Sequence, residues 1–437
     1  MSSGSSDKQI SSERGLRVAV AALRYRDYRR FAASLLLTSL GVQLLQTAVF
    51  WQVYELTGDA LLLGLTGLAR ALPHMVLSMV GGVFADRFNR VRLIQAGQIA
   101  NGLLILALAG LTLADAVELW HLYGLTFLNA SFSAVTQPAR TALIPSLIPR
   151  RNLVNAVALN ATIGQTSQII GPALGGIVVG VFDLGTTYLL NGAIYLAAMV
   201  AILGIRTPST PAATSTSPWH SFLEGLAFVR QRRVIVSLLM LDLAATVLGS
   251  YRALLPIFAA SLGVGATGFG LLSAAPGVGS MVAATAMLSL GDVRYKGLYT
   301  AFGVLGYAVS LVLLALSPWF ALSLLAGALL GATNVIQMIP RNSAILAISP
   351  DALRGRVEAF RSMLAGGGPP LGFTLSGALA AAFGAPLAVI LGAIACAASV
   401  GGIVAQDDEL RDPELGIAAP EGETEPATGA GEVAGSA

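Results

Sequence analysis

Long apolar runs recur along the whole chain, and short polar or charged segments separate them. Each run has about the 20 residues that an α-helix needs to cross the hydrocarbon core of a bilayer. The pattern therefore predicts an all-α membrane protein with twelve transmembrane helices. We place the apolar runs at residues 31–54, 60–84, 93–114, 121–146, 154–182, 186–205, 234–260, 268–290, 298–317, 319–348, 356–382 and 385–405.

Composition agrees with a membrane protein and argues against an enzyme. Of the 437 residues, 55% are hydrophobic and 11% are charged, whereas a soluble domain has about 25% charged residues. The single cysteine, Cys396, excludes an intrachain disulfide. The histidines His74, His121 and His220 are scattered and form no metal set. No phosphate-binding or dinucleotide-binding glycine motif is present, so we expect no cofactor.

The basic residues predict which side of the membrane each loop occupies. We assign 21 of the 26 Lys and Arg residues to segments on one side, five to the spans and none to the opposite loops. Loops rich in Lys and Arg usually lie in the cytoplasm. Both termini are therefore expected in the cytoplasm of a multi-pass cell-membrane protein. The net charge of +3 reflects this topology and does not indicate nucleic-acid binding.

The chain divides into two halves joined by a Ser/Thr/Pro-rich stretch, TPSTPAATSTSP, that reads as a flexible linker. Behind it, Trp219, Phe222, Leu223 and Leu226 have helical spacing, which predicts a short helix on the membrane surface. The alternative is that they begin the seventh span. The predicted units are a basic segment 1–30, a six-helix bundle 31–206, a linker 207–233, a second bundle 234–405 and a disordered acidic tail 406–437.

The two halves repeat each other. Asp86 ends the second span four residues before Arg90, and Asp292 ends the eighth span four residues before Lys296. The fifth span contains GPALG and the eleventh contains GPPLG. Paired halves of this kind are how many secondary transporters are built.

The loop GGVFADRFNRVRLI, at residues 81–94, carries a family signature. Gly82, Asp86, Arg87 and Arg90 match the motif G-x-x-x-D-R-x-G-R-[RK], whereas Asn89 and Val91 depart from it. The loop resembles that of the major facilitator superfamily of transporters. The resemblance implies that Asp86 faces the start of the eleventh span and holds the inner side shut, with Arg87 and Arg90 as its cationic partners. The alternative is that these charges only set the topology.

A second motif, GPALGG at residues 171–176, resembles the fifth-helix motif of drug:proton antiporters through Gly171, Pro172, Gly175 and Gly176. Ala158 and Ser167 stand where that longer pattern usually has glycines. The resemblance implies a seam along which two helices slide, and the alternative is static packing of small residues. The segments PARTALIP and SPDALRGRVEAF are similar to the branch that contains macrolide and siderophore (enterobactin-type) exporters.

Charged residues inside spans are costly and are candidates for function by default. Asp242 is the only carboxylate that we place deep in a span, which makes it the candidate for proton coupling. Glu358 and Arg361 are spaced to pair on one helix face. For every such residue the alternative is a buried structural ion pair. The other charges that we place in spans are Arg70, Arg140, Arg252 and Arg341.

Uncharged polar residues also recur in the spans. In the superfamily that the motifs resemble, the first, fourth, seventh and tenth spans line a central cavity. The resemblance implies that polar side chains on these spans, with Arg70 and Asp242, orient a substrate; the alternative is hydrogen bonding between helices. These polar candidates are Gln43, Gln46, Asn129, Asn334 and Gln337.

Together these features predict a monomeric secondary transporter that works by alternating access. The main hypothesis is proton-coupled efflux of amphipathic small molecules such as antibiotics, with Asp242 as the protonated group because the first span has no acid. The alternatives are a dedicated siderophore or lipid exporter, and a membrane sensor or scaffold that transports nothing.

Overall fold

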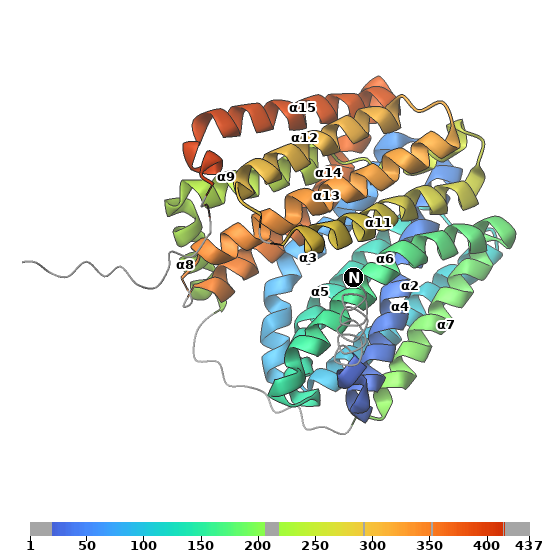
Figure 1. Cartoon of the computed structure of the whole chain (residues 1–437). Coiled ribbons are helices and arrows are strands. Elements are labelled where there is room, and N and C mark those ends of the chain that lie inside the picture. The colour runs from blue at the N-terminus through green and yellow to red at the C-terminus, as the bar shows by residue number, and fades with distance from the viewer. Residues whose placement is uncertain (1–19, 206–217, 292, 351–352, 414, 416–437) are drawn as a thin grey trace, which may run out of the picture.

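The computed structural model describes residues 20–205, 218–291, 293–350, 353–413 and 415. In this part of the chain the structure consists of helices and connecting loops, without strands. The helices form two groups that lie side by side, one drawn in blue to green and the other in yellow-green to red (Figure 1). The predicted all-α membrane fold with two halves is confirmed.

The first group contains six long helices preceded by a short 3-10 turn, Val20–Arg24. Local chemistry sets several of their ends. Asp59 accepts hydrogen bonds from the N–H groups of Leu61 and Leu62 at the start of the second long helix. Hydrogen bonds from Thr186 hold the pKa of Asp183 below its usual range where the sixth helix begins. The six helices are α2 (Arg26–Thr57), α3 (Ala60–Arg87), α4 (Arg90–Leu113), α5 (Leu119–Leu147), α6 (Leu153–Val181) and α7 (Leu184–Leu203).

The second group repeats this arrangement with one difference, because its first span is broken. The run 234–260 was expected to be one helix. Instead a π-helical turn, Ala244–Leu248, and a 3-10 turn, Arg252–Leu254, separate α9 (Arg233–Leu243) from α10 (Leu255–Ser261). The remaining helices are α11 (Gly265–Leu290), α12 (Lys296–Ala315), α13 (Phe320–Ile348), α14 (Arg354–Phe383) and α15 (Ala385–Gln406).

Each expected span thus coincides with a long helix or, at 234–260, with a broken one. By length and composition, nine segments of the described chain are long and apolar enough to cross a membrane. The helix ends form two contrasting layers. One end of the bundle, which we call the basic end, carries Arg26, Arg92, Arg151, Arg233 and Arg354. At the opposite end, which we call the acidic end, none of the described loops contains Lys or Arg, and those of the first group, 58–59, 114–118 and 182–183, contain Asp or Glu. The loops of the second group at this end, 262–264, 316–319 and 384, are uncharged.

The two groups meet closely towards the acidic end. A Cβ added to Gly64 would lie 2.8 Å from the Cα of Gly377, so α3 and α14 touch backbone to backbone there. The same holds for Gly176 of α6 and Gly270 of α11, at 2.5 Å. Aromatic rings cover the remaining gap, with Trp51 stacked on Phe269 at 5.9 Å between ring centroids. The halves are therefore closed against each other at the acidic end.

The linker region contains a separate helix. Helix α8 (Pro218–Gln231) ends at Gln231, and Arg232 separates it from α9, so the hydrophobic residues after the linker do not simply begin the seventh span. Glu224 of α8 forms an ion pair with Arg356 of α14. The helix is thereby attached to the basic end of the second group. Residues 1–19 and 207–217, in the predicted basic segment and linker, lie outside the described part.

The predicted disordered tail is partly wrong, because residues 407–413 fold back onto the basic end of the second group. Ser237 of α9 donates a hydrogen bond of 2.6 Å to the carboxylate of Asp407. Leu410 is fully buried in a cluster that includes Val234 and Val357. Apolar burial and this hydrogen bond order a segment whose acidic composition indicated disorder. Residues 416–437 lie outside the described part.

Candidate functional site

The largest described cavity, of about 490 Å³, lies inside the first group of helices. Every residue that lines it belongs to α2–α7, and none comes from the second group. On α2, α5 and α6 its walls are the segments nearer the basic end, from Phe31 on α2 to Ile144 on α5 and Asn160 on α6. The cavity therefore occupies the basic half of the bundle, below the closed acidic end.

Two arginines line this cavity. Arg70 of α3 donates a hydrogen bond of 2.8 Å to Gln46 of α2. Arg140 of α5, whose residue surface is 8% exposed, donates one of 3.3 Å to Thr38 of α2. No Asp or Glu lines the cavity, and within the described chain neither guanidinium lies within ion-pair distance of a carboxylate.

Uncharged polar groups complete the cavity wall. Asn129, a predicted cavity residue, donates a hydrogen bond of 2.9 Å to Asn101 of α4. Gln98 of α4 donates to Thr38 at 3.1 Å, so the partner of Arg140 is itself held in place. Tyr195 of α7 also faces the cavity. The wall thus offers hydrogen-bond donors and acceptors around two cations.

Two smaller cavities of about 40 and 30 Å³ lie where the groups of helices meet. Gln46 borders both, and Phe50 stands between them as a shared wall. Gln43 and Arg252 border the smaller one. Arg252 was expected to be buried, but its side chain is exposed because it lies on the 3-10 turn that interrupts the seventh span.

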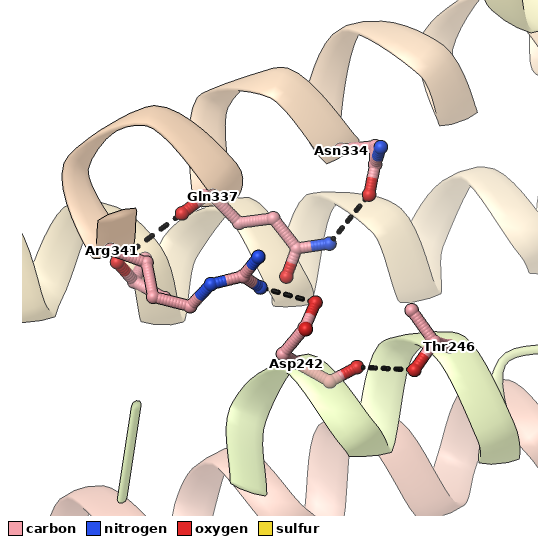
Figure 2. Close-up of polar contacts among 6 residues, drawn as sticks. Asp242, Thr246, Asn334, Gln337 and Arg341 are labelled. Atoms are coloured by element: carbon pink, nitrogen blue, oxygen red, sulfur yellow. Dashed lines mark hydrogen bonds and ion pairs between the residues drawn. The ribbon is translucent and has the colours of Figure 1, made fainter. Parts of the chain in front are cut away.

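In the second group, the deep carboxylate and arginine are paired with each other. Asp242 of α9 forms an ion pair with Arg341 of α13, as Figure 2 shows. Both side chains are covered by protein, with exposed fractions of 12% and 4%. For these two residues the alternative of a buried ion pair is confirmed. Proton coupling through Asp242 stays a prediction.

Asn334 and Gln337 were expected to line a substrate cavity, and they line none of the three described above. Gln337 is fully buried and donates a hydrogen bond of 3.1 Å to Asn334 (Figure 2). Its side-chain oxygen has no hydrogen-bond partner. The hydrogen bond between the two amides lies within helix α13.

The two arginines occupy matching positions. Helices α5 and α13 both contain 29 residues, and Arg140 and Arg341 are each the 22nd residue of their helix. Each side chain reaches the first spanning helix of its own group, α2 for Arg140 and α9 for Arg341. The repeat therefore preserves the arginine and replaces its partner, a threonine in one half and an aspartate in the other.

Glu358 and Arg361 pair on α14 as predicted, with Arg361 donating a hydrogen bond of 2.8 Å to the carboxylate. The pair is not buried, however, because the Glu358 side chain is 54% exposed. It lies on the first turns of α14, at the basic end.

The structure describes some of the residues of the loop motif at 81–94. Gly82 meets nothing within 4 Å, and its neighbour Gly81 makes the close contact, with the backbone of α5. Arg90 donates a hydrogen bond of 2.9 Å to the carbonyl of Ala142, whereas Arg87 is exposed. The side chain of Asp86 and all of Asp292 lie outside the described part, and Lys296 is buried at the start of α12. The predicted latch stays a prediction.

The GPALGG motif has two faces. Gly171 and Gly175 lie against Gln43 and Thr47 of α2, in the same group of helices. Gly176 lies against Gly270 of α11, in the other group. Pro172 is buried between them and also borders the smallest cavity. Close approach on both faces fits either a packing seam or a sliding seam.

Several cavity residues were not expected from the sequence. Four of them are uncharged and were not predicted as cavity residues: Thr38, Gln98, Asn101 and Tyr195. His74 was considered only as a metal ligand. Gln98 and Asn101 stand in the apolar run 93–114 at helical spacing, which is a usable signal. No local pattern separates Thr38 or Tyr195 from ordinary buried residues.

Comparison with known proteins identifies the family. A family model described as "transmembrane secretion effector" matches residues 18–417. The chain belongs to this family. Its members are transporters of the major facilitator superfamily, so the chain is a small-molecule transporter and not an enzyme.

Curated relatives and solved structures agree with this assignment. The enterobactin exporter EntS of Shigella boydii serotype 4 is 26% identical over 345 residues, which cover 79% of this chain and 82% of the relative. EntS of Escherichia coli O81 is 25% identical over 360 residues, or 80% and 83%. The nucleoside transporter NupG matches with a TM-score of 0.70 at 14% identity over 87% of this chain and 98% of its own.

A bacterial homologue of the human lysosomal transporter Spinster, in an inward-facing and occupied conformation, also matches. Its TM-score is 0.70 at 15% identity, over 89% of this chain and 98% of its own. At such low identity these two structures bear on the fold alone. They show that the two groups of helices are the two halves of the major facilitator fold.

Proposed function

We propose that the protein exports a polar organic molecule from the cytoplasm by alternating access, in a cycle coupled to protons. The observation that carries this proposal is the position of the 490 Å³ cavity in the basic half of the bundle, below a closed acidic end. Because basic loops usually face the cytoplasm, both termini would be cytoplasmic and this conformation would face inward.

A siderophore-type substrate is the first candidate. The curated relatives are exporters of enterobactin, and the cavity wall is rich in hydrogen-bonding groups. An amphipathic drug is the second candidate. A specific observation favours it: apolar side chains, among them Leu45, Val49 and Phe50, form part of the wall of the small cavity between the halves.

Proton coupling is assigned to Asp242. A proton bound there would neutralise one side of its ion pair with Arg341 and leave the guanidinium buried without a counter-ion. Helix α9 joins the break in the seventh span just beyond Asp242, so a change in this pair acts on an interrupted helix. Losing the pair would shift the balance between conformations that differ in how α9 and α13 contact each other.

Purified protein in liposomes tests the proposal directly. With an imposed pH gradient, the wild type should accumulate a siderophore, or a dye from an antibiotic panel, against its concentration gradient. Asp242→Asn should lose this uphill transport and keep exchange down a substrate gradient, because exchange needs no protonation step. Uphill transport by Asp242→Asn at the wild-type rate would refute the coupling role. Absence of any flux from the wild type across the panel would refute export.

A further inference from the structure

The cavity in the first half contains two cations and no anion. Arg70 and Arg140 line it, His74 lies one turn from Arg70, and the other lining side chains are uncharged. A guanidinium has five N–H donors. In the described chain Arg70 has one side-chain hydrogen-bond partner, Gln46, and Arg140 has one, Thr38. Most of the donors are therefore available to a ligand.

Burial makes this arrangement costly in the empty protein. A charged side chain in the middle of a membrane is unfavourable unless it is paired or faces water. The matching arginine of the second half, Arg341, offsets the cost with Asp242. Arg140 has only the neutral Thr38 in that place, although it is 8% exposed. Within the described chain no carboxylate pairs with Arg140, so a bound anion would supply the counter-charge.

We propose that this cavity binds an organic anion through Arg70 and Arg140. The ligand would carry a carboxylate, catecholate or phosphate group, since such oxygen anions accept paired hydrogen bonds from a guanidinium. The body of the ligand would rest against Phe31, Leu35 and Ile144. This inference rests on the proposed export function and names the substrate class of the same site.

The position of the site determines which half of the protein would hold the anion. All of its lining residues belong to α2–α7, so the anion would be held by one half of the protein and would move with that half. The second half would contribute closure at the acidic end and the Asp242–Arg341 pair, with no direct contact to the charged group of the ligand.

Binding of two xanthene dyes of similar shape and opposite charge tests the proposal. Fluorescein is an anion and tetramethylrosamine is a cation at neutral pH. Fluorescence anisotropy with the wild type in lipid nanodiscs, in a buffer without carboxylate or phosphate anions, should show tighter binding of fluorescein. Arg70→Gln and Arg140→Gln should each weaken fluorescein binding at least about tenfold, as expected when one partner of a buried charge pair is removed. Neither should weaken binding of the cation.

Two controls keep the test decisive. Arg151→Gln removes one charge from the exposed basic end and should leave the binding of both dyes unchanged. If an arginine variant does not fold, dye-dependent thermal stabilisation of the wild type replaces it, and fluorescein should stabilise more than tetramethylrosamine. Equal binding of both dyes, or unchanged fluorescein binding in a folded Arg70→Gln, Arg140→Gln double variant, would overturn the proposal. Liposome flux without anion preference would refute only this inference, whereas anion binding without flux would refute only export.

Discussion

The two halves of the protein place an arginine at the same position of equivalent helices and surround it differently. Arg341 in the second half is covered, paired with Asp242 and bordered by no described cavity. Arg140 in the first half borders a cavity of about 490 Å³ and contacts Thr38. The same backbone position thus serves a closed contact in one half and an open, charged surface in the other.

The difference shows how an internal repeat can divide its work. An ion pair between two helices of one half fixes their distance and leaves no charge for a ligand. A lone arginine beside a cavity leaves its two helices without a strong mutual contact and offers its charge to a ligand. We therefore expect stability to depend on the second half's arginine and ligand binding to depend on the first half's.

The largest expected effect is on stability, and it should differ between the two arginines. Arg341→Gln leaves the buried carboxylate of Asp242 without its partner, which should lower stability by about 3–5 kcal/mol. Arg140→Gln removes an uncompensated charge and should leave stability unchanged or raise it. Thermal unfolding of both variants in the same detergent measures the difference. Equal losses of stability in the two variants would contradict the different roles assigned to the two arginines. The double variant Asp242→Asn, Arg341→Gln should recover most of the stability that Arg341→Gln loses.

The second prediction tests whether the two halves have the same close helix contacts, α3 with α5 and α11 with α13, although their arginines have different partners. A Cβ at Gly81 would meet the backbone of Ala134, and a Cβ at Gly279 would meet the backbone of Ala328. Gly81→Ala and Gly279→Ala should each lower stability by about 1–3 kcal/mol through overpacking of α3 on α5 and of α11 on α13. Gly82→Ala is the control, since nothing lies near it. A destabilised Gly82→Ala, or a Gly279→Ala variant as stable as the wild type, would contradict these shared helix contacts.

The smallest effect is expected when the first half is given the second half's chemistry. Thr38→Asp places a carboxylate beside Arg140, as Asp242 stands beside Arg341. The new acid should compete with an anionic ligand and weaken fluorescein binding about tenfold, or about 1.4 kcal/mol. Thr38→Asn keeps a polar group without charge and should weaken it less. Fluorescence anisotropy on both variants is the measurement, and tighter anion binding by Thr38→Asp would contradict the assigned role of Arg140.

The positions of the spans could be predicted from the sequence because apolar length is a local property. The break in the seventh span could not. The π-helical turn at residues 244–248 has the sequence AATVL, which contains neither proline nor glycine. The turn packs against α14 and α15, and contacts between segments far apart in the sequence leave no local signal. Gly249 and Pro256 flank the break, but similar residues occur inside the unbroken helices of this chain.

The site was predictable as a set of residues and not as an arrangement. Charge in an apolar run singled out Arg70, Arg140, Asp242 and Arg341, because such charges are rare. Which of them pair depends on how helices far apart in the sequence face each other. The sequence therefore could not show that Asp242 meets Arg341, or that Arg140 meets Thr38. For the same reason it placed Asn334 and Gln337 in a substrate cavity, whereas they line none of the three cavities described above.

The folded segment after α15 bears on how the protein is made. Leu410 fills the basic end of the second half, between residues of α9 and α14, and Asp407 is bonded to Ser237. The first half takes its corresponding cover from Val20–Arg24, ahead of its own helices. During synthesis the first half therefore has all its described parts once residue 205 is made. The second half can finish packing only after residue 410 has left the ribosome, so a chain cut at Gln406 would insert its helices and still lack the cover of its second half.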